Sequence, residues 1–262
     1  LLFFISLSLG VMNLNNLLKG IIVQSGNDAC IVVAEGISGD EDTFADLMNA
    51  KARELGLVNS NFTNATGWPD DNHYMTPLDL AILTKSLIYD FPNFYNLFKE
   101  KEFTYNNIKQ NNRNPLLYSY QFSDGLKTGY TDISGYSLAS SAVKGNRRLI
   151  AVLSGMDNVK ERKDETIKVL EWAFREYTNI NLFSKGDTVI EADVWLGKKP
   201  IIDLVAKNDI LFTLKKKNTK IYNAKVILDS PIKAPIAKGE IYGKIIISDT
   251  VEGNIEYPII AK

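Results

Sequence analysis

The chain has 262 residues, of which 45% are hydrophobic and 23% charged, and its net charge is -1. This is the composition of a globular chain that can bury a core and form one large and one small domain. The neutral charge balance excludes a nucleic-acid-binding surface, and a single cysteine (Cys30) and a single histidine (His73) exclude both an intrachain disulfide and a metal site of several thiols or imidazoles.

The first twelve residues, LLFFISLSLGVM, look like the apolar core of a secretion signal. They lack an initiating methionine, a basic region and a small-residue cleavage site, and they are too short to span a membrane. We therefore expect them to be internal sequence of a chain that is truncated at its start.

Two helices are predicted on either side of a polar segment, residues 24–28. The pattern LNNLLKGIIV at 14–23 suits one helix, and residues 29–37 suit a second, largely buried one. Ser25 and Asn27 would then lie where the two helices meet. Considered alone, they are interpreted as helix caps, because Ser and Asn commonly satisfy free amides at helix ends.

Two more helices follow around a loop. Residues 40–55 are amphipathic and end at Gly56, and a second helix begins at Thr76, which is predicted to be its N-cap. The intervening residues 59–75 are rich in Asn, Asp, Gly and Pro, which predicts a loop. We interpret His73 as a solvated residue of this loop rather than a metal ligand or base.

The second half of the chain changes from helix to strand. Residues 135–143 and 148–155 predict a hairpin, and residues 159–177 predict an amphipathic helix. Beyond Thr178, six short apolar runs separated by turn residues predict a small antiparallel β-domain. We therefore divide the chain into residues 1–178 and a small β-sandwich at 179–262.

Two short motifs carry the functional prediction. One is Ser25-Gly26-Asn27 on the helix connection, and the other is Lys127-Thr128-Gly129 on a strand just before the hairpin. They are two of the three elements found in penicillin-interacting serine enzymes. Either tripeptide alone is weak evidence, but together they have the expected order, a spacing of roughly a hundred residues and the expected local structure.

The stretches around these motifs, KGIIVQSGNDAC and DGLKTGYTDISGYSLASSAVKGNRRLIAV, resemble the D-alanyl-D-alanine carboxypeptidases, the low-molecular-mass penicillin-binding proteins of serine peptidase family S11. The resemblance covers about residues 14 to 178. It implies an α+β fold, a fragment of the serine β-lactamase/transpeptidase-like fold with helices on an antiparallel sheet, followed by a small all-β domain.

The resemblance also implies roles for individual residues. Ser25 would relay a proton to the leaving amine, and Asn27 would hydrogen-bond the substrate backbone. Lys127 and Thr128 would bind the terminal carboxylate of the substrate.

Three further residues complete the predicted site. Gly129 would let the substrate lie along the strand edge, and the backbone N–H of Tyr130 would be an oxyanion donor. Arg162, at the start of the predicted helix at 159–177, would also help to hold the carboxylate.

The nucleophilic Ser-x-x-Lys of the family is expected some sixty residues before Ser25, where this chain has only 24 residues. Two matches occur elsewhere, Ser141 to Lys144 and Ser230 to Lys233. We reject both as chance matches to a permissive pattern, since the first falls at a hairpin turn and the second, which contains a proline, lies in the β-domain. We therefore expect this polypeptide to be inactive unless the missing segment is restored.

Three interpretations stay open. The first is a penicillin-sensitive D-Ala-D-Ala carboxypeptidase acting on peptidoglycan stem peptides, and the second is a remnant without a nucleophile that at most binds such peptides. The third, a related β-lactamase, is disfavoured because no Glu-x-x-Leu-Asn element separates the two motifs. The resemblance implies no cofactor or metal, β-lactam antibiotics as ligands, a periplasmic location and, in the family, peripheral membrane attachment through a C-terminal segment not present in this sequence.

Overall fold

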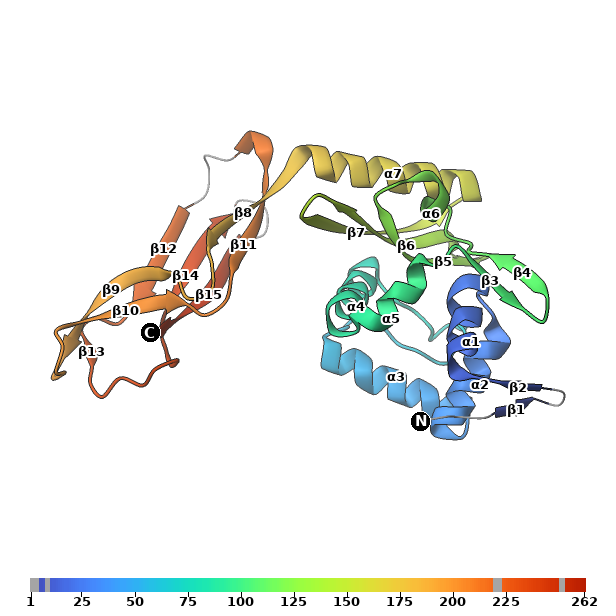
Figure 1. Ribbon diagram of the computed structural model, residues 1–262, viewed down its shortest axis with the longest axis horizontal. Coiled ribbons are helices and arrows are strands. Elements are labelled where there is room, and N and C mark those ends of the chain that lie inside the picture. The colour runs from blue at the N-terminus through green and yellow to red at the C-terminus, as the bar shows by residue number, and fades with distance from the viewer. Residues whose placement is uncertain (1–4, 8–9, 219–222, 250–252) are drawn as a thin grey trace. The chain divides into compact units, whose positions relative to one another are not determined.

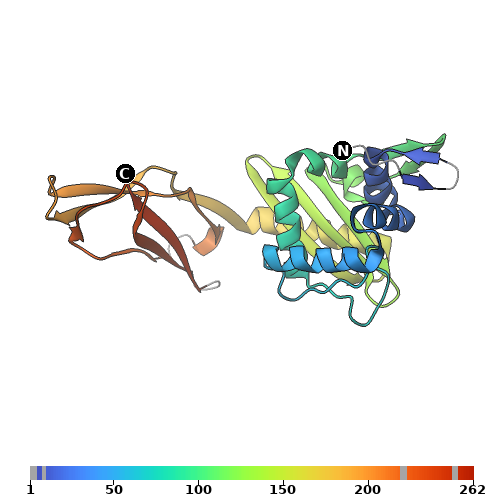
Figure 2. The same cartoon turned by 90° about the horizontal axis from the view of Figure 1, so that it is seen from below.

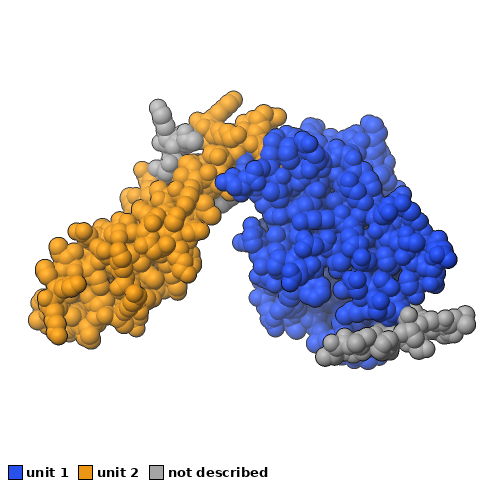
Figure 3. Space-filling model, in the orientation of Figure 1, with its two compact units in different colours: residues 1–173 blue, residues 174–262 orange. Residues whose placement is uncertain are grey.

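The structure is a computed structural model that describes residues 5–7, 10–218, 223–249 and 253–262. The chain forms two compact units, residues 1–173 (unit 1) and residues 174–262 (unit 2) (Figure 3). The division lies within helix α7 (Val159–Glu176), whereas the sequence-based boundary follows Thr178.

Unit 1 combines helices with short antiparallel sheets. Its helical segments before α7 are α1 (Leu14–Lys19), the π-helical turn η1 (Gly20–Gln24), α2 (Asn27–Ser38), α3 (Glu41–Leu55), α4 (Pro77–Asp90), α5 (Pro92–Tyr95), the 3-10 turn η2 (Asn96–Lys99) and α6 (Leu116–Ser119). Its strands are β1 (Ile5–Leu7), β2 (Gly10–Met12), β3 (Glu102–Tyr105), β4 (Ile108–Asn111), β5 (Ser123–Thr131), β6 (Gly135–Lys144) and β7 (Arg147–Met156).

A three-stranded antiparallel sheet in the order β5-β6-β7 organises unit 1. Helix α7 lies along one face of this sheet, and α4 and α5 lie on the other (Figures 1 and 2). On the second face, Ile88 of α4, Tyr95 of α5 and Leu126 of β5 form a buried cluster. In this sheet β5 is an edge strand, and among the described residues β6 is the strand paired with it.

The helix boundaries follow from local chemistry, as the sequence predicts. The Asp40 carboxylate accepts a hydrogen bond from the N–H of Thr43 at 2.7 Å, and α3 ends at Gly56 with a φ of +77°. The Thr76 hydroxyl accepts a hydrogen bond from the N–H of Asp79, with proline at the first position of α4. Both helix predictions are confirmed.

Other elements were not predicted. The β3–β4 hairpin turns at Asn106 and Asn107, with φ of 47° and 61°, and both of its strands are mostly exposed. Asparagine tolerates this left-handed region, so the Asn106-Asn107 pair is the feature of the sequence from which the hairpin turn could have been predicted. Of the first twelve residues, Ile5–Leu7 and Gly10–Met12 pair as β1 and β2, and the rest lie outside the described residues.

Unit 2 is all-β, as expected. Its elements are β8 (Tyr177–Phe183), β9 (Thr188–Trp195), β10 (Ile201–Ala206), β11 (Ile210–Lys215), the turn η3 (Lys216–Asn218), β12 (Asn223–Leu228), β13 (Ile232–Lys233), β14 (Ile241–Asp249) and β15 (Gly253–Ala261). A six-stranded sheet has the order β12-β14-β15-β10-β9-β13, and β11 pairs with β8. One apolar core joins both sheets and includes Leu204, Ile210, Ile245 and Ile259.

Candidate active site

Ser25 occupies the junction between η1 and α2. Its φ of 59° and ψ of 45° put it in the left-handed region, which is uncommon for serine. The N–H groups of Ser25 and Gly26 both donate to the carbonyl of Gly20, which holds this turn in place. Strained backbone that is held in this way is often found at functional sites.

Asn27 is the first residue of α2, and its side chain is exposed. The side chain makes no hydrogen bond to any residue that the structure describes, so its amide is available to a ligand. The interpretation of Ser25 and Asn27 as helix caps is therefore wrong for α2. The N-cap of this helix is Gly26, which has no side chain.

Lys127 approaches Ser25 from β5. Its ammonium donates one hydrogen bond to the hydroxyl of Ser25 and another, at 2.9 Å, to the carbonyl of Thr128. Burial lowers the pKa of Lys127 to about 8, and the positive charge of Arg113 and, less strongly, that of Arg162 lower it as well. At neutral pH Lys127 is still mainly an ammonium ion.

Arg162 lies in the first turn of α7 and is only 5% exposed. Its guanidinium donates a 3.4 Å hydrogen bond to the carbonyl of Gly129 and lies 5.4 Å from the ring centre of Tyr136. Burial lowers the pKa of Arg162 from its usual value. Its Nε is buried and has no hydrogen-bond partner among the residues that the structure describes.

These groups line one cavity of about 610 Å³. The lining consists of Ser25, Asn27, Thr66, Arg113, Lys127, Thr128, Gly129, Tyr130, Tyr136, Val159 and Arg162. Every residue predicted for the site is therefore in the lining. Three of the eleven lining residues have cationic side chains and none is acidic, so the cavity is suited to an anionic group such as a carboxylate.

The edge position of β5 gives the cavity a second property. A Cβ atom added to Gly129 would meet only the Cβ of Ser137, at an ordinary 3.7 Å. Packing within unit 1 therefore does not require glycine at this position, whereas an extended peptide laid along β5 would gain room from it. The neighbouring Tyr130 has its ring 4.4 Å from that of Tyr136, and its assignment as an oxyanion donor stays a prediction.

Arg113 is a cavity residue that the sequence prediction missed. The residues on either side of it, Asn112 and Asn114, are buried, and the Asn112 side chain accepts a hydrogen bond from the N–H of Asn114. Asn114 in turn accepts one from the N–H of Leu116. This turn, which is held by the two asparagine side chains, leaves Arg113 exposed at the cavity. The Asn-Arg-Asn-Pro sequence is the feature from which the turn could have been predicted.

Neither Ser-x-x-Lys match is in this cavity. Ser141 is completely buried on β6, where its hydroxyl accepts a hydrogen bond from Arg148. Ser230 lies in unit 2, next to β13. The loop histidine, His73, contacts Thr63 and is not in the cavity lining. Within the described ranges, no cluster of three His, Cys, Asp or Glu side chains could hold a metal ion.

Comparison with known proteins gives matches to both parts of the chain. A model of the D-alanyl-D-alanine carboxypeptidase family matches residues 3–158, and a model of the C-terminal domain of penicillin-binding protein 5 matches residues 177–262. The chain is 38% identical over 233 residues to D-alanyl-D-alanine carboxypeptidase DacA of Escherichia coli, covering 88% of this chain and 58% of that protein. It is 37% identical over 256 residues to DacF of Bacillus subtilis, covering 96% of this chain and 66% of DacF.

The fold is also similar to solved structures. Penicillin-binding protein 5 of Haemophilus influenzae superposes with a TM-score of 0.88 at 36% identity, over 96% of this chain and 74% of that one. The ampicillin-bound penicillin-binding protein D2 of Listeria monocytogenes gives a TM-score of 0.59 at 28% identity, over 66% of this chain and 76% of that one.

Proposed function

Because the chain belongs to the D-alanyl-D-alanine carboxypeptidase family, serine peptidase family S11, we propose that the protein removes the terminal D-alanine from peptidoglycan stem peptides. In this reaction a serine oxygen bonds to the carbonyl carbon of the penultimate D-alanine, and the C–N bond to the last D-alanine breaks. Water then hydrolyses the acyl-enzyme ester. The observation that carries the proposal is the cavity in which Ser25 accepts a hydrogen bond from Lys127, one of three cationic side chains in the lining.

The cations give the cavity its selectivity for a chain end. Lys127, with Thr128 beside it, binds the terminal carboxylate, and Arg162 and Arg113 add positive charge around it. An internal peptide bond carries no such charge, so its binding would gain nothing from these groups.

Ser25 and Asn27 act on the other side of the scissile bond. The Ser25 hydroxyl already accepts a hydrogen bond from Lys127, so it can donate its own proton to the leaving amine of D-alanine. The Asn27 amide, which has no hydrogen-bond partner among the described residues, hydrogen-bonds the substrate backbone, while the substrate adds to the edge strand β5.

The nucleophile itself is not supplied by either Ser-x-x-Lys match, because Ser141 is buried away from the cavity and Ser230 lies in unit 2. The chain spans 58% of the length of the Escherichia coli relative. We therefore propose that these 262 residues bind the substrate and supply the helping groups, and that hydrolysis requires a Ser-x-x-Lys segment placed at this cavity.

Two other functions are weaker candidates. A protein that only binds stem peptides would use the same cavity. Unlike the enzyme, it would release no D-alanine when the Ser-x-x-Lys segment is provided. A β-lactamase is disfavoured because the chain has no Glu-x-x-Leu-Asn element between its two motifs.

The proposed substrate places the protein on the outer side of the bacterial inner membrane, in the periplasm where one exists, with β-lactams as further ligands. None of the helices in the described ranges is long and apolar enough to cross a bilayer.

The proposal is tested by attaching a family Ser-x-x-Lys segment to the N-terminus of this chain and measuring D-alanine release from a pentapeptide. The proposal is supported if the joined protein releases D-alanine and if the Lys127→Gln substitution lowers the rate of release at least tenfold. A joined, folded protein that binds the peptide at this cavity but releases no D-alanine would favour the binding-only alternative.

A further inference from the structure

Unit 2 presents a second notable surface at the turn between β9 and β10. Here β13 pairs in parallel with β9, with Lys233 opposite Trp195, and the N–H of Ala234 donates a 3.0 Å hydrogen bond to the Trp195 carbonyl. Residues 194–202 and 230–239 thus lie side by side, and together we call them the hairpin tip. None of these residues lines the candidate active-site cavity of unit 1.

The hairpin tip exposes large apolar side chains. Trp195 is 54% exposed, Leu196 69% and Ile201 47%. Leu196 also has a φ of +59°, a left-handed conformation that is unfavourable for leucine. Because its side chain is exposed, burial of that side chain does not offset this cost. A Cβ atom on Gly197 would lie 2.5 Å from the Val194 side chain, so the position after Leu196 accepts a larger residue only if Val194 moves.

The charged side chains within the hairpin tip are all lysines, and the residues just outside its four ends are acidic: Asp193, Asp203, Asp229 and Glu240. The nineteen residues of the hairpin tip (nine in 194–202 and ten in 230–239) contain four lysines and no Asp or Glu, whereas the whole chain has a net charge of -1. The lysines are Lys198, Lys199, Lys233 and Lys238. Lys198 and Lys199 form no ion pair with any residue that the structure describes, and the Lys233 ammonium lies 5.7 Å from the centre of the Trp195 ring.

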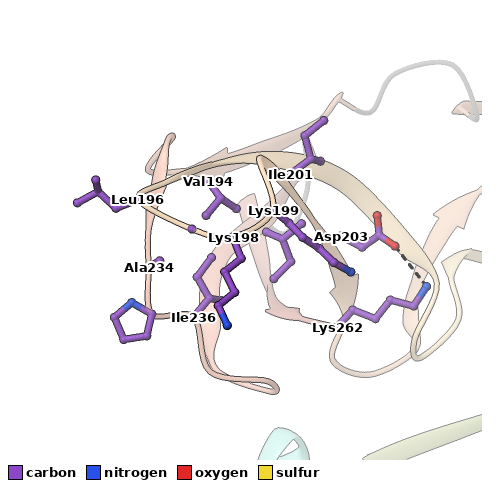
Figure 4. Close-up of a pocket in the computed structure, with 12 residues that line it drawn as sticks. Val194, Leu196, Lys198, Lys199, Ile201, Asp203, Ala234, Ile236 and Lys262 are labelled. Carbon is purple, nitrogen blue, oxygen red and sulfur yellow. Dashed lines mark hydrogen bonds and ion pairs between the residues drawn. The ribbon is translucent and has the colours of Figure 1, made fainter.

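A cavity of about 910 Å³ lies at this turn and is lined by Lys198, Lys199, Lys262, Ile236 and eight further residues, among them Asp203. Figure 4 shows Lys198 and Lys199 projecting toward the side of Ile236 and Lys262, while Leu196 extends away from them. Lys262 is paired with Asp203 at 3.3 Å. The apolar side chains and the free ammonium groups therefore occupy adjacent parts of one surface.

We propose that the hairpin tip docks on the surface of an anionic phospholipid bilayer. Trp195 and Leu196 enter the boundary between headgroups and acyl chains, where indole rings are favoured, and the lysines contact lipid phosphates. A bilayer surface offers hydrocarbon and negative charge at neighbouring depths, which matches the arrangement of the hairpin tip. This contact is separate from the proposed peptidase chemistry and does not depend on it.

The test is co-sedimentation of the 262-residue chain with vesicles. We expect binding to vesicles of phosphatidylglycerol and phosphatidylethanolamine, weaker binding as salt is raised, and little binding to phosphatidylcholine. The double variant Lys198→Glu/Lys199→Glu should weaken partitioning by roughly tenfold or more. The matched variant Lys215→Glu/Lys217→Glu changes the net charge equally in another exposed part of unit 2 and should retain most of the binding.

Fluorescence tests the apolar part of the contact without removing it. With Trp68→Phe and Trp172→Phe, Trp195 is the only tryptophan left of the three, and brominated phosphatidylglycerol should quench its emission. Absence of binding to the anionic vesicles, equal loss of binding in the two lysine variants, or an unquenched Trp195 in the bound protein would each overturn the proposal. An acidic protein or polymer as the true partner would give the first of these results.

Discussion

The ammonium of Lys127 donates a hydrogen bond to the hydroxyl of Ser25, which lies 102 positions earlier in the chain. This contact joins the edge strand β5 to the turn between two helices, and so connects the two motifs across the cavity. The ammonium is partly buried near other cations, so the pKa of Lys127 should change when one of the neighbouring groups is removed.

Ser25→Ala should lower the pKa of Lys127 below its present value of about 8. The substitution removes an acceptor that stabilises the charged ammonium and leaves the Thr128 carbonyl. NMR titration of lysine side chains measures the change. Ser119→Ala, at an exposed position of α6, serves as the control and should leave the Lys127 pKa unchanged. A pKa that stays the same in Ser25→Ala would remove the hydroxyl from the environment of Lys127.

Arg113→Gln should have the opposite effect and raise the pKa of Lys127, because it removes the neighbouring positive charge with the largest effect. Arg113 is exposed, so the fold should survive. Affinity for a carboxylate ligand should fall by roughly two- to fivefold, as expected for one exposed charge. Arg53→Gln, an exposed arginine of α3 outside the cavity lining, provides the matched control. Equal affinities of the Arg113 variant and the wild type would show that Arg113 does not act on the ligand.

Binding of a carboxylate ligand should weaken as the pH rises through about 8. The lowered pKa means that Lys127 is mainly charged at pH 7 and mainly neutral at pH 9, and only the charged form attracts the carboxylate. Isothermal titration at a series of pH values measures this dependence. Lys127→Gln should bind weakly at every pH, and a Lys127→Gln variant that kept the same midpoint would assign the titration to another group.

The helices α3 and α4 could be predicted because local chemistry marks their ends, as at Gly56 and Thr76. The two motifs could also be recognised, since a Ser-x-Asn and a Lys-Thr-Gly are short and continuous in the sequence. Arg113 could not be found in this way, because it reaches the cavity only through the turn held by Asn112 and Asn114. The β8 strand was missed because it follows α7 directly, with no Gly or Pro to mark the end of the helix.

Asp124→Asn should destabilise unit 1 by about 1 to 3 kcal/mol. Its carboxylate accepts hydrogen bonds from Arg148 at 2.8 and 2.9 Å and from the Tyr95 hydroxyl at 2.8 Å, at the start of β5. Urea unfolding measures the free energy of unfolding. Asp71→Asn, in the exposed loop at 59–75, should change it by less than about 0.5 kcal/mol. A loss in Asp124→Asn no larger than this would show that the network does not stabilise β5.

The central claim, that this cavity recognises a free peptide C-terminus through Lys127, is tested most directly by a pair of ligands. One is an acyl-D-alanyl-D-alanine peptide with a free carboxylate, and the other is its C-terminal amide. NMR titration at pH 7 should show that the acid binds at least tenfold more tightly and shifts the resonances of Ser25, Asn27 and Thr128. Lys127→Gln should remove the preference for the acid. Equal affinities of the acid and the amide for the wild-type chain would contradict the account.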